Sequence, residues 1–371
     1  MAECFVLLFL VAYAISVGAL VFLGWFRQQV KEKKAKNARV LLEEITLIIP
    51  FRDEANRLEG LLNSIVSSER QVNSYIFVND HSSDDSSALI KNKLHDLPIL
   101  IIDLPSGLSG KKQAIKFGIH QAKTNYILTL DADVSFEKNY LDSLTNLESA
   151  DLYILPVLMK ADNFFHSFFE FDVLLINALN AGVSGWCRPI VASGANLLIS
   201  KSSYESCSRF SLHEHIASGD DVYLMKDLRA ENKEILLSTS SQLLVTTETP
   251  RSWREFLNQR IRWIAKTGHV NDPLANAIGF GQAIFAMGFL ALIIFLLISS
   301  NYGLFWALFG IKCLLDFIFF SPYFLRFKRF NALMLLPLYQ VFFPFYQFLL
   351  LLLLPFFKPT WKGRQTRVVK Q

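Results

Sequence analysis

The chain has 371 residues, of which 52% are apolar and 19% charged, and its formal net charge is +4. This composition is too apolar for an ordinary soluble enzyme and not apolar enough for a protein made only of membrane helices, so we expect a soluble domain joined to membrane segments. Lysines and arginines gather beside apolar stretches, at 31–39, 326–329 and 358–370. Such placement is typical of charges at a membrane edge and argues against a nucleic-acid-binding surface. The widely spaced cysteines match neither a zinc site nor a disulfide framework.

The apolar stretch at 5–26 has the length of a membrane helix. A signal peptide is the alternative, but this stretch is too long, no positive charge precedes it, and the basic cluster follows it. The positive-inside rule places that cluster in the cytoplasm. We therefore predict an N-terminal anchor over residues 1–28, a basic linker over 29–44, and a cytoplasmic domain after the linker.

Residues 45–249 are predicted to form an α/β domain. Apolar strands at 45–50, 75–78, 99–103 and 126–130 alternate with stretches of helical spacing at 58–68, 86–94 and 111–122. This alternation predicts a mostly parallel sheet flanked by helices, with ligands bound beyond the carboxyl ends of the strands. Acidic residues follow every one of these strands: Asp53 and Glu54, then Asp80, then Asp103, then Asp131 and Asp133.

The fourth strand ends in Asp131-Ala-Asp133. Residues two apart in an extended backbone point to the same side, so both carboxylates can face one point. Two carboxylates suit Mg²⁺ or Mn²⁺ carried with a diphosphate, because Mg²⁺ takes one or two protein carboxylates and completes its shell with water and phosphate oxygens. An acidic turn that merely ends the strand is the alternative.

Further polar residues stand at the same predicted edge of the sheet. Asn79 and Asp80 can accept hydrogen bonds from a nucleoside, or can close an Asx turn with the serines that follow. Lys111, next to Gly110 at a helix N-terminus, is well placed for a pyrophosphate, with a solvated helix lysine as the alternative. Arg52 either pairs with phosphate or balances the acids beside it, and the sequence does not decide between these roles.

The second half of the domain contains three features. Phenylalanines at 164–171 favour packing in a helix core or at a membrane surface over contact with a lipid acceptor. A tight loop at 193–196 leads into a strand. Asp220 and Asp221 open a helical stretch, where carboxylates are favoured by the helix dipole and by capping, so a structural role competes with a chemical one.

Residues 250–276 are predicted to form an interfacial basic amphipathic helix. Gln259, Arg262 and Trp263 share one of its faces. An arginine there can hold a diphosphate through two parallel hydrogen bonds, and a tryptophan can stack against an acceptor. A membrane-surface helix with a tryptophan anchor is the alternative, and both can hold at once.

The region 277–357 is predicted to be membrane-embedded, with two spans at 277–299 and 304–320. Lys312 and Asp316 lie four residues apart in the second span, so we expect them to pair across one helical turn. The stretch 331–357 is longer than one span needs, too short for two, and interrupted by prolines. We predict a broken or re-entrant hairpin there, which keeps the basic tail 358–371 in the cytoplasm.

These motifs resemble those of family 2 glycosyltransferases with the GT-A fold, and the resemblance covers most of the chain. It is carried, in the family's order, by Pro50-Phe-Arg52-Asp-Glu54, Val78-Asn-Asp80-His-Ser-Ser-Asp84, Gly110-Lys111-Lys-Gln-Ala114 and Asp131-Ala-Asp133. Gln259-Arg-Ile-Arg262-Trp263 resembles the Gln-X-X-Arg-Trp motif of the family's membrane-bound branch, which includes ceramide glucosyltransferases and chitin, cellulose and hyaluronan synthases. The expected fold is therefore a GT-A type α/β domain with one N-terminal and two to four C-terminal membrane segments.

The resemblance also implies a set of site residues. The nucleotide sugar would be bound by Pro50, Arg52, Glu54, Asp80, Lys111, Asp131, Gly194 and Asn196. Asp131 and Asp133 would hold a divalent metal, Mg²⁺ or Mn²⁺. Asp221 would be the general base, and Asp220, Gln259, Arg262 and Trp263 would face the acceptor or the diphosphate.

We expect an inverting, metal-dependent glycosyltransferase in the plasma membrane of a bacterium, with its catalytic domain in the cytoplasm. It would move a sugar from a nucleotide diphosphate sugar, expected to be a UDP-sugar, to a lipid or another membrane-associated hydroxyl acceptor. A processive polysaccharide synthase is one alternative, although few spans follow the domain. A non-catalytic membrane protein that binds nucleotide sugar or acts as a scaffold is the alternative of another class, and the retained acids argue against it.

Overall fold

The structure, a computed structural model, describes residues 1–33, 39–207, 220–354, 360–361 and 364–365. The chain folds into two compact units. The helical unit contains Met1–Lys33, Ala161–Val191 and Thr249–Gln365, and the sheet unit contains Lys34–Lys160, Ala192–Glu248 and Thr366–Gln371. The segment predicted as one domain, 45–249, is therefore interrupted by 161–191, which cluster with the apolar helices.

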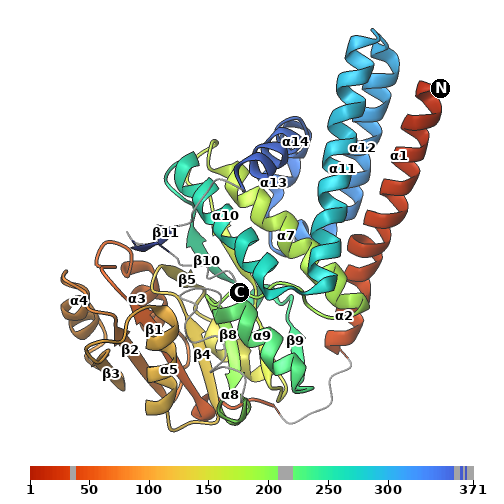
Figure 1. Cartoon of the computed structure of the whole chain (residues 1–371). Helices are drawn as coiled ribbons and strands as arrows, with labels where there is room; N and C mark the ends of the chain where they lie inside the picture. The colour runs from red at the N-terminus through yellow and green to blue at the C-terminus, as the bar shows by residue number, and fades with distance from the viewer. Residues whose placement is uncertain (34–38, 208–219, 355–359, 362–363, 366–371) are drawn as a thin grey trace. The chain divides into compact units, whose positions relative to one another are not determined.

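The sheet unit is built on a seven-stranded mixed sheet with the order β3-β2-β1-β4-β8-β6-β9 (Figure 1). Its first four strands run parallel: β3 (Ile99–Asp103), β2 (Ser74–Asn79), β1 (Ile45–Phe51) and β4 (Tyr126–Leu130). β8 (Asn196–Ser200) is antiparallel to β4 and to β6 (Leu152–Ile154), and β9 (Ile235–Leu237) is parallel to β6. The predicted mostly parallel α/β sheet is confirmed.

A smaller sheet and several helices complete this unit. The three-stranded sheet has the order β5-β10-β7, formed by Val134–Phe136, Val245–Glu248 and Val157–Lys160. The helices are α3 (Glu59–Val66), α4 (Ser86–Lys93), α5 (Lys111–Gln121), α6 (Tyr140–Ser143), α8 (Lys201–Ser206) and α9 (Asp220–Ala230). Single 3₁₀ turns are formed by Leu42–Glu44, Leu144–Asn146 and Ser241–Leu243.

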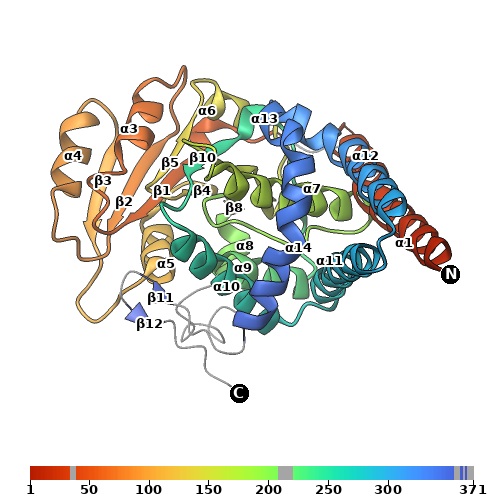
Figure 2. The same ribbon diagram turned by 90° about the horizontal axis from the view of Figure 1, so that it is seen from above.

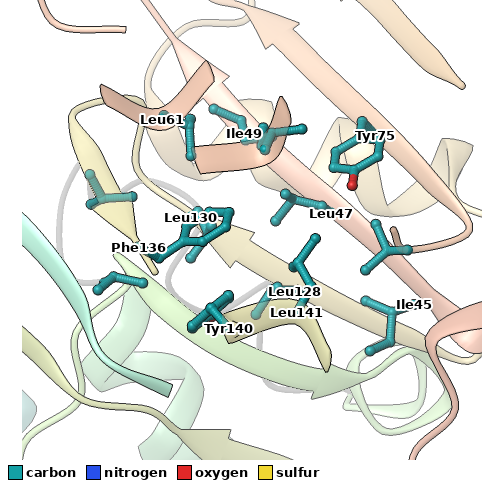
Figure 3. Packing of buried hydrophobic residues seen from close by; sticks show 14 of the residues in the cluster. Ile45, Leu47, Ile49, Leu61, Tyr75, Leu128, Leu130, Phe136, Tyr140 and Leu141 are labelled. Atoms are coloured by element: carbon teal, nitrogen blue, oxygen red, sulfur yellow. The ribbon is translucent and has the colours of Figure 1, made fainter. Parts of the chain in front are cut away.

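Both faces of β1 are buried, as expected of a central parallel strand. One face packs into the cluster shown in Figure 3, which joins β1 and β4 to α3 and α6 through residues including Ile45, Leu47, Ile49, Leu61, Leu128, Leu130, Tyr140 and Leu141. The other face packs against α5, where a Cβ on Gly118 would lie only 2.8 Å from the Ile48 side chain. This close approach holds α5 against the strands, with Lys111 as its first residue.

The helical unit contains the apolar helices. A continuous N-terminal stretch consists of α1 (Ala2–Val17), a π-helical segment (Gly18–Leu23) and α2 (Gly24–Lys33). The remaining elements are α7 (Ser167–Trp186), α10 (Trp253–Val270), α11 (Pro273–Ile298), α12 (Tyr302–Arg326), α13 (Phe330–Met334), α14 (Leu336–Leu353), and the short strands β11 (Thr360–Trp361) and β12 (Arg364–Gln365). The stretches 2–33, 273–298, 302–326 and 336–353 are long and apolar enough to cross a membrane. One N-terminal and three C-terminal apolar helices agree with the predicted fold class.

The described residues of 331–357 do not form a two-armed helical hairpin, and the predicted re-entrant path with a cytoplasmic tail stays a prediction. The structure has a single long helix there, α14, after the one-turn helix α13. Pro337 lies in the first turn of α14, where backbone N–H groups make no hydrogen bond within the helix, so a proline is tolerated there. Pro344 lies inside the helix, where it removes one backbone hydrogen bond. Because Pro344 is buried, neighbouring residues pack against this turn and stabilise it. Pro355 lies outside the described residues.

Glycines bring α2 and α7 into direct backbone contact. A Cβ on Gly24 would lie 2.3 Å from the carbonyl oxygen of Gly182, and one on Gly185 would lie 1.9 Å from that of Gly24. Small residues allow this close packing of apolar helices. The Nζ atom of Lys31 donates to the carbonyl oxygen of Ser184 at 2.7 Å, which places a cation at the C-terminal end of α7.

One packing prediction for this unit is confirmed, and another holds for three of five phenylalanines. Lys312 Nζ lies 2.7 Å from Asp316 Oδ2 on the next turn of α12, and both side chains are buried. Phe168, Phe169 and Phe171 are buried on α7, whereas Phe164 and Phe165, just before that helix, are 56% and 72% exposed. Phe169 stacks on Phe256 of α10 with 4.1 Å between ring centroids.

Candidate active site

The predicted site residues of the sheet unit gather where the parallel strands end. Asp80 follows β2, Asp131 follows β4, and Lys111 opens α5. Gly194 lies in the loop that enters β8, and Asp221 lies in the first turn of α9. Hydrogen bonds and an ion pair connect Lys111, Asp131, Gly194 and Asp221, whereas Asp80 is bonded to Gly110, the residue before Lys111.

Gly194 links the two ends of the cluster. Its carbonyl oxygen accepts a hydrogen bond of 3.3 Å from Lys111 Nζ, and the same ammonium is ion-paired with Asp131. The Gly194 N–H donates to Asp221 Oδ2 at 3.1 Å, and the Val222 N–H donates to Asp221 Oδ1 at 2.8 Å. The carboxylate after β4 and the carboxylate of α9 therefore stand on two sides of one loop residue.

Asp80 is nearly fully buried, with 2% of its surface exposed. Its Oδ2 atom accepts a hydrogen bond of 3.0 Å from the N–H of Gly110, a residue whose φ of +97° favours glycine, and lies 3.9 Å from Arg52 Nη1. Its Oδ1 atom has no hydrogen-bond partner within the described part of the chain. A buried carboxylate oxygen without a donor is costly, and it leaves one acceptor position for a ligand.

Arg57 is a site residue that sequence reasoning missed. It forms an ion pair with Asp133, and its Nη1 atom lies 3.7 Å from Glu54 Oε2. The available signal was a basic residue three positions after Glu54, in the same loop between strand and helix. Each acid of the Asp131-Ala-Asp133 motif therefore has its own cation.

The loops after β1 and β2 are tied to each other. Asp53, at a φ of +50°, accepts hydrogen bonds from the N–H and the hydroxyl of Ser83 at 2.7 and 3.1 Å. Asn79 accepts from the Ser82 N–H at 2.8 Å, so the Asx-turn interpretation applies to Asn79 and not to Asp80. Arg52 lies 3.6 Å from Asp53 and 3.9 Å from Asp80, so in this structure it balances both acids.

The Asn196 side chain is a buried link between elements, and its role toward the donor sugar stays a prediction. Its surface is 0% exposed, and its amide donates to the carbonyl oxygens of Pro156 and Leu243, each at 3.0 Å. Its Oδ1 atom accepts from the Tyr140 hydroxyl at 2.6 Å. Both amide hydrogens are thus used within the chain. Pro50 lies within β1, opposite Val78 of β2.

Their surroundings shift the pKa values of two acids near the site, Asp131 and Asp53, in opposite directions. Burial raises the pKa of Asp131, the neighbouring carboxylates of Asp133 and Asp221 raise it further, and Lys111 opposes both effects. At the rim, hydrogen bonds from Ser83 hold the pKa of the exposed Asp53 carboxyl below its ordinary value.

The residues present fit a divalent cation bound together with a diphosphate. Asp131 and Asp133 supply oxygen ligands of the kind that Mg²⁺ and Mn²⁺ prefer, and their mutual repulsion favours a cation between them. Among the described residues no group of three His, Cys, Asp or Glu side chains could hold a metal ion by itself. Phosphate oxygens and water would complete such a shell.

A cavity of about 420 Å³ adjoins the cluster. Gly194 and Asp221 lie on its wall, together with side chains of α5, β8 and α9 that include Ile115, Leu197 and Leu224. The general-base candidate therefore faces a space with a largely apolar wall.

The remaining predicted site residues lie elsewhere or are not described. Gln259, Arg262 and Trp263 lie on α10 in the helical unit, and their role toward a diphosphate or an acceptor stays a prediction. The side chain of Asp220 lies outside the described part of the chain. Arg260, between the motif residues, is buried and forms an ion pair with Asp172 of α7.

Two family models match the chain over the residues that carry the site. Residues 126–357 match the model described as "Glycosyl transferase family group 2", and residues 46–162 match "Glycosyl transferase family 2". The first match spans more than half of the chain. The chain is a family 2 glycosyltransferase. This family 2 enzyme carries the acids and the glycine loop described above within the matched residues.

The curated relatives are similar over a limited part of the chain. The 4,4'-diaponeurosporenoate glycosyltransferase of Staphylococcus aureus (strain bovine RF122 / ET3-1) is 31% identical over 142 residues, which are 38% of this chain and 36% of the relative. The protein of the same name from strain MRSA252 is 30% identical over the same shares. The chain thus matches about a third of the length of these relatives.

A solved structure shares the fold over nearly the whole chain. The mannosyltransferase PcManGT from Pyrobaculum calidifontis, in complex with GDP-Man and Mn²⁺, has a TM-score of 0.56 and 14% sequence identity. The alignment covers 92% of this chain and 99% of that one. At this identity the likeness establishes the fold.

Proposed function

We propose that this family 2 glycosyltransferase transfers a sugar from a nucleotide diphosphate sugar to an apolar, membrane-associated acceptor, with inversion at the anomeric carbon. The observation that supports this most directly is the position of Gly194 between Lys111, which pairs with Asp131, and Asp221. One cleft can thereby present a cation to a diphosphate and a carboxylate to an acceptor. The non-catalytic alternative would need none of this pairing.

The donor would be held by residues at the strand ends. The buried Asp80 offers its free oxygen to a nucleoside N–H or O–H group. Lys111, at the N-terminus of α5, can turn from Asp131 toward the diphosphate, where backbone N–H groups add positive potential. Arg52 and Arg57 lie beside these groups and can balance the diphosphate charge. A divalent metal bound by Asp131 and Asp133 would neutralise charge on the leaving diphosphate.

Asp221 would act as the general base. Its carboxylate removes the proton from an acceptor hydroxyl while that oxygen attacks the anomeric carbon, and the bond from that carbon to the diphosphate breaks on the opposite side. The N–H groups of Gly194 and Val222 donate to both oxygens of this carboxylate and hold it in place. A single displacement of this kind requires no carboxylate nucleophile.

The acceptor proposal rests on the apolar helices and on the cavity wall next to Asp221. The curated relatives are named as glycosyltransferases of 4,4'-diaponeurosporenoate, and this name agrees with the proposal of a lipid-like acceptor. We propose a cytoplasmic site, because Arg27, Lys31 and Lys33 follow the first apolar stretch and no lysine or arginine lies between α11 and α12.

The test is a transfer assay with full-length protein in lipid nanodiscs. Labelled UDP- and GDP-sugars are supplied with Mn²⁺ and a bacterial lipid extract, and we expect label in the organic phase. The Asp221→Asn variant should lose transfer about 10²- to 10⁴-fold while still binding nucleotide. Asp142→Asn, which changes an exposed acid paired with Arg70, is the matched control and should retain activity. A long polymer without glycolipid would refute the acceptor, and no transfer or donor hydrolysis with any sugar would refute the enzyme.

A further inference from the structure

The last long helix of the helical unit, α14, runs in a different direction from the other apolar helices. Figure 1 shows α11 and α12 at nearly full length and α14 foreshortened, whereas Figure 2, turned by 90°, shows α14 at nearly full length and the other two foreshortened. All three helices belong to the same compact unit. α14 therefore lies across the bundle that α1, α11 and α12 form.

The order of contacts gives the directions of the three bundle helices. Tyr13 of α1 bonds to Asp316 of α12, and further along both helices the ring centroids of Trp25 and Tyr323 are 5.6 Å apart. α1 and α2 thus run parallel to α12. The turn at 299–301 reverses the chain between α11 and α12. The ends at Lys33, Pro273 and Arg326 consequently lie on one side of the bundle.

A buried polar cluster attaches α14 to this bundle. Gln340 accepts from Lys312 Nζ at 2.9 Å and donates to Asp316, while Tyr13 donates to the other oxygen of Asp316. All four side chains are at most 8% exposed. Asp316 lies ten residues before Arg326, the last residue of α12, or about 15 Å along the helix. Gln340 is therefore held about halfway along a membrane-length helix.

The outer face of α14 is apolar over its whole length. Leu338, Val341, Phe342, Phe345, Phe348 and Leu352 recur every three or four residues and are 39% to 54% exposed. The helix contains no charged residue. Tyr339, Gln340 and Tyr346 are buried on its inner face. A helix with its polar groups inward and apolar groups outward suits hydrocarbon as its surroundings.

We infer that α14 does not cross the membrane but lies within one leaflet, with its outer face against the acyl chains of that leaflet. The bonds of Gln340 to Lys312 and Asp316 set the depth of α14 in the bilayer. They also satisfy the side-chain amide of Gln340, which would be costly to leave without partners in hydrocarbon. Three helices then cross the bilayer. The chain after α14 then stays on the side of Lys33 and Arg326. This inference depends on the membrane assignment and not on the transferase chemistry.

Depth measurements along α14 test the inference. A variant lacking Cys4, Cys187, Cys207 and Cys313 receives single cysteines at Leu338, Phe345 or Leu352, labelled with an environment-sensitive fluorophore in phosphatidylcholine and phosphatidylglycerol vesicles. Quenching by lipids that carry spin labels at different acyl-chain positions reports the depth of each site. We expect the three depths to agree within about one helical turn, or about 5 Å.

A bundle helix supplies the matched control. Phe280 and Phe295 are exposed on α11 and stand fifteen residues apart, so labels there should differ in depth by about 22 Å. A difference near 21 Å between positions 338 and 352 would show that α14 crosses and would overturn the inference. An unfolding temperature close to that of the native protein establishes that each labelled variant is folded.

Reporter fusions to the unaltered chain give an independent measurement. Green fluorescent protein fused after Gln371 should be fluorescent in bacterial cells, and alkaline phosphatase at the same point should be inactive. Alkaline phosphatase inserted in the turn at Ser300 should be active. An active phosphatase at both points would mean a fourth crossing and would refute the placement of α14.

Discussion

Asp80→Asn tests the proposal that the free carboxylate oxygen of this buried residue after β2 accepts a hydrogen bond from the nucleotide. The substitution leaves an oxygen for the N–H of Gly110 but replaces the free carboxylate oxygen by an amide donor, and it removes the charge beside Arg52. A hydrogen bond to a charged group contributes about 1.5 to 3 kcal/mol. Nucleotide affinity should therefore fall about 10- to 150-fold.

The same substitution should not destabilise the fold. Asp80 is 2% exposed and one of its oxygens is unsatisfied, so the carboxylate costs folding free energy in the absence of ligand. We expect the unfolding temperature of the ligand-free variant to equal or exceed that of the native protein. A loss of affinity through misfolding would instead lower it.

Isothermal titration calorimetry with UDP and with GDP, each with Mn²⁺, measures the affinity, and thermal unfolding measures the stability. Asp103→Asn is the matched control: this exposed acid ends β3 at the same sheet edge and accepts from Asn79 at 2.8 Å. Its nucleotide affinity should stay within about twofold of native. Unchanged affinity in Asp80→Asn, or an unfolding temperature several degrees lower, would refute the reasoning.

Three further predictions follow from the same structure. The folded state raises the pKa of Asp131, so the stability contributed by its bound proton is present near the ordinary pKa of an aspartate and is lost as the pH rises through the raised pKa; over that rise the unfolding temperature of the native protein should fall more than that of Asp131→Asn, and native transfer activity should decline on acidification. Gly182→Ala, which places a Cβ 2.2 Å from a backbone carbonyl oxygen, should lower the unfolding temperature, whereas Gly281→Ala, with nothing within 4 Å, should leave it unchanged. Arg260→Met leaves the buried Asp172 without its ion-pair partner and should lower the free energy of unfolding by about 3 to 5 kcal/mol. The double variant that also carries Asp172→Leu should regain most of this free energy, as measured by chemical unfolding.

Local sequence patterns predicted much of this molecule. Alternating strands and helices placed Asp80 and Asp131 at one edge of the sheet, because parallel strands carry their carboxyl ends to the same side. The four-residue spacing predicted the pair of Lys312 and Asp316, since such residues share a helix face. Apolar length predicted the membrane helices.

Other features needed the tertiary structure, because they join residues far apart in the chain. Gly194 stands between Lys111 and Asp221 only because β8 enters the sheet antiparallel beside β4. Arg57 meets Asp133 across 76 positions of sequence.

The burial of Asn196 and the direction of α14 likewise depend on what packs against them. The side-chain amide of Asn196 bonds to two carbonyl groups and a tyrosine hydroxyl, and no sequence pattern around Asn196 predicts these partners. Hydropathy measures how apolar a helix is and not which way it runs, so the path of α14 was decided by Gln340 and its partners on other helices.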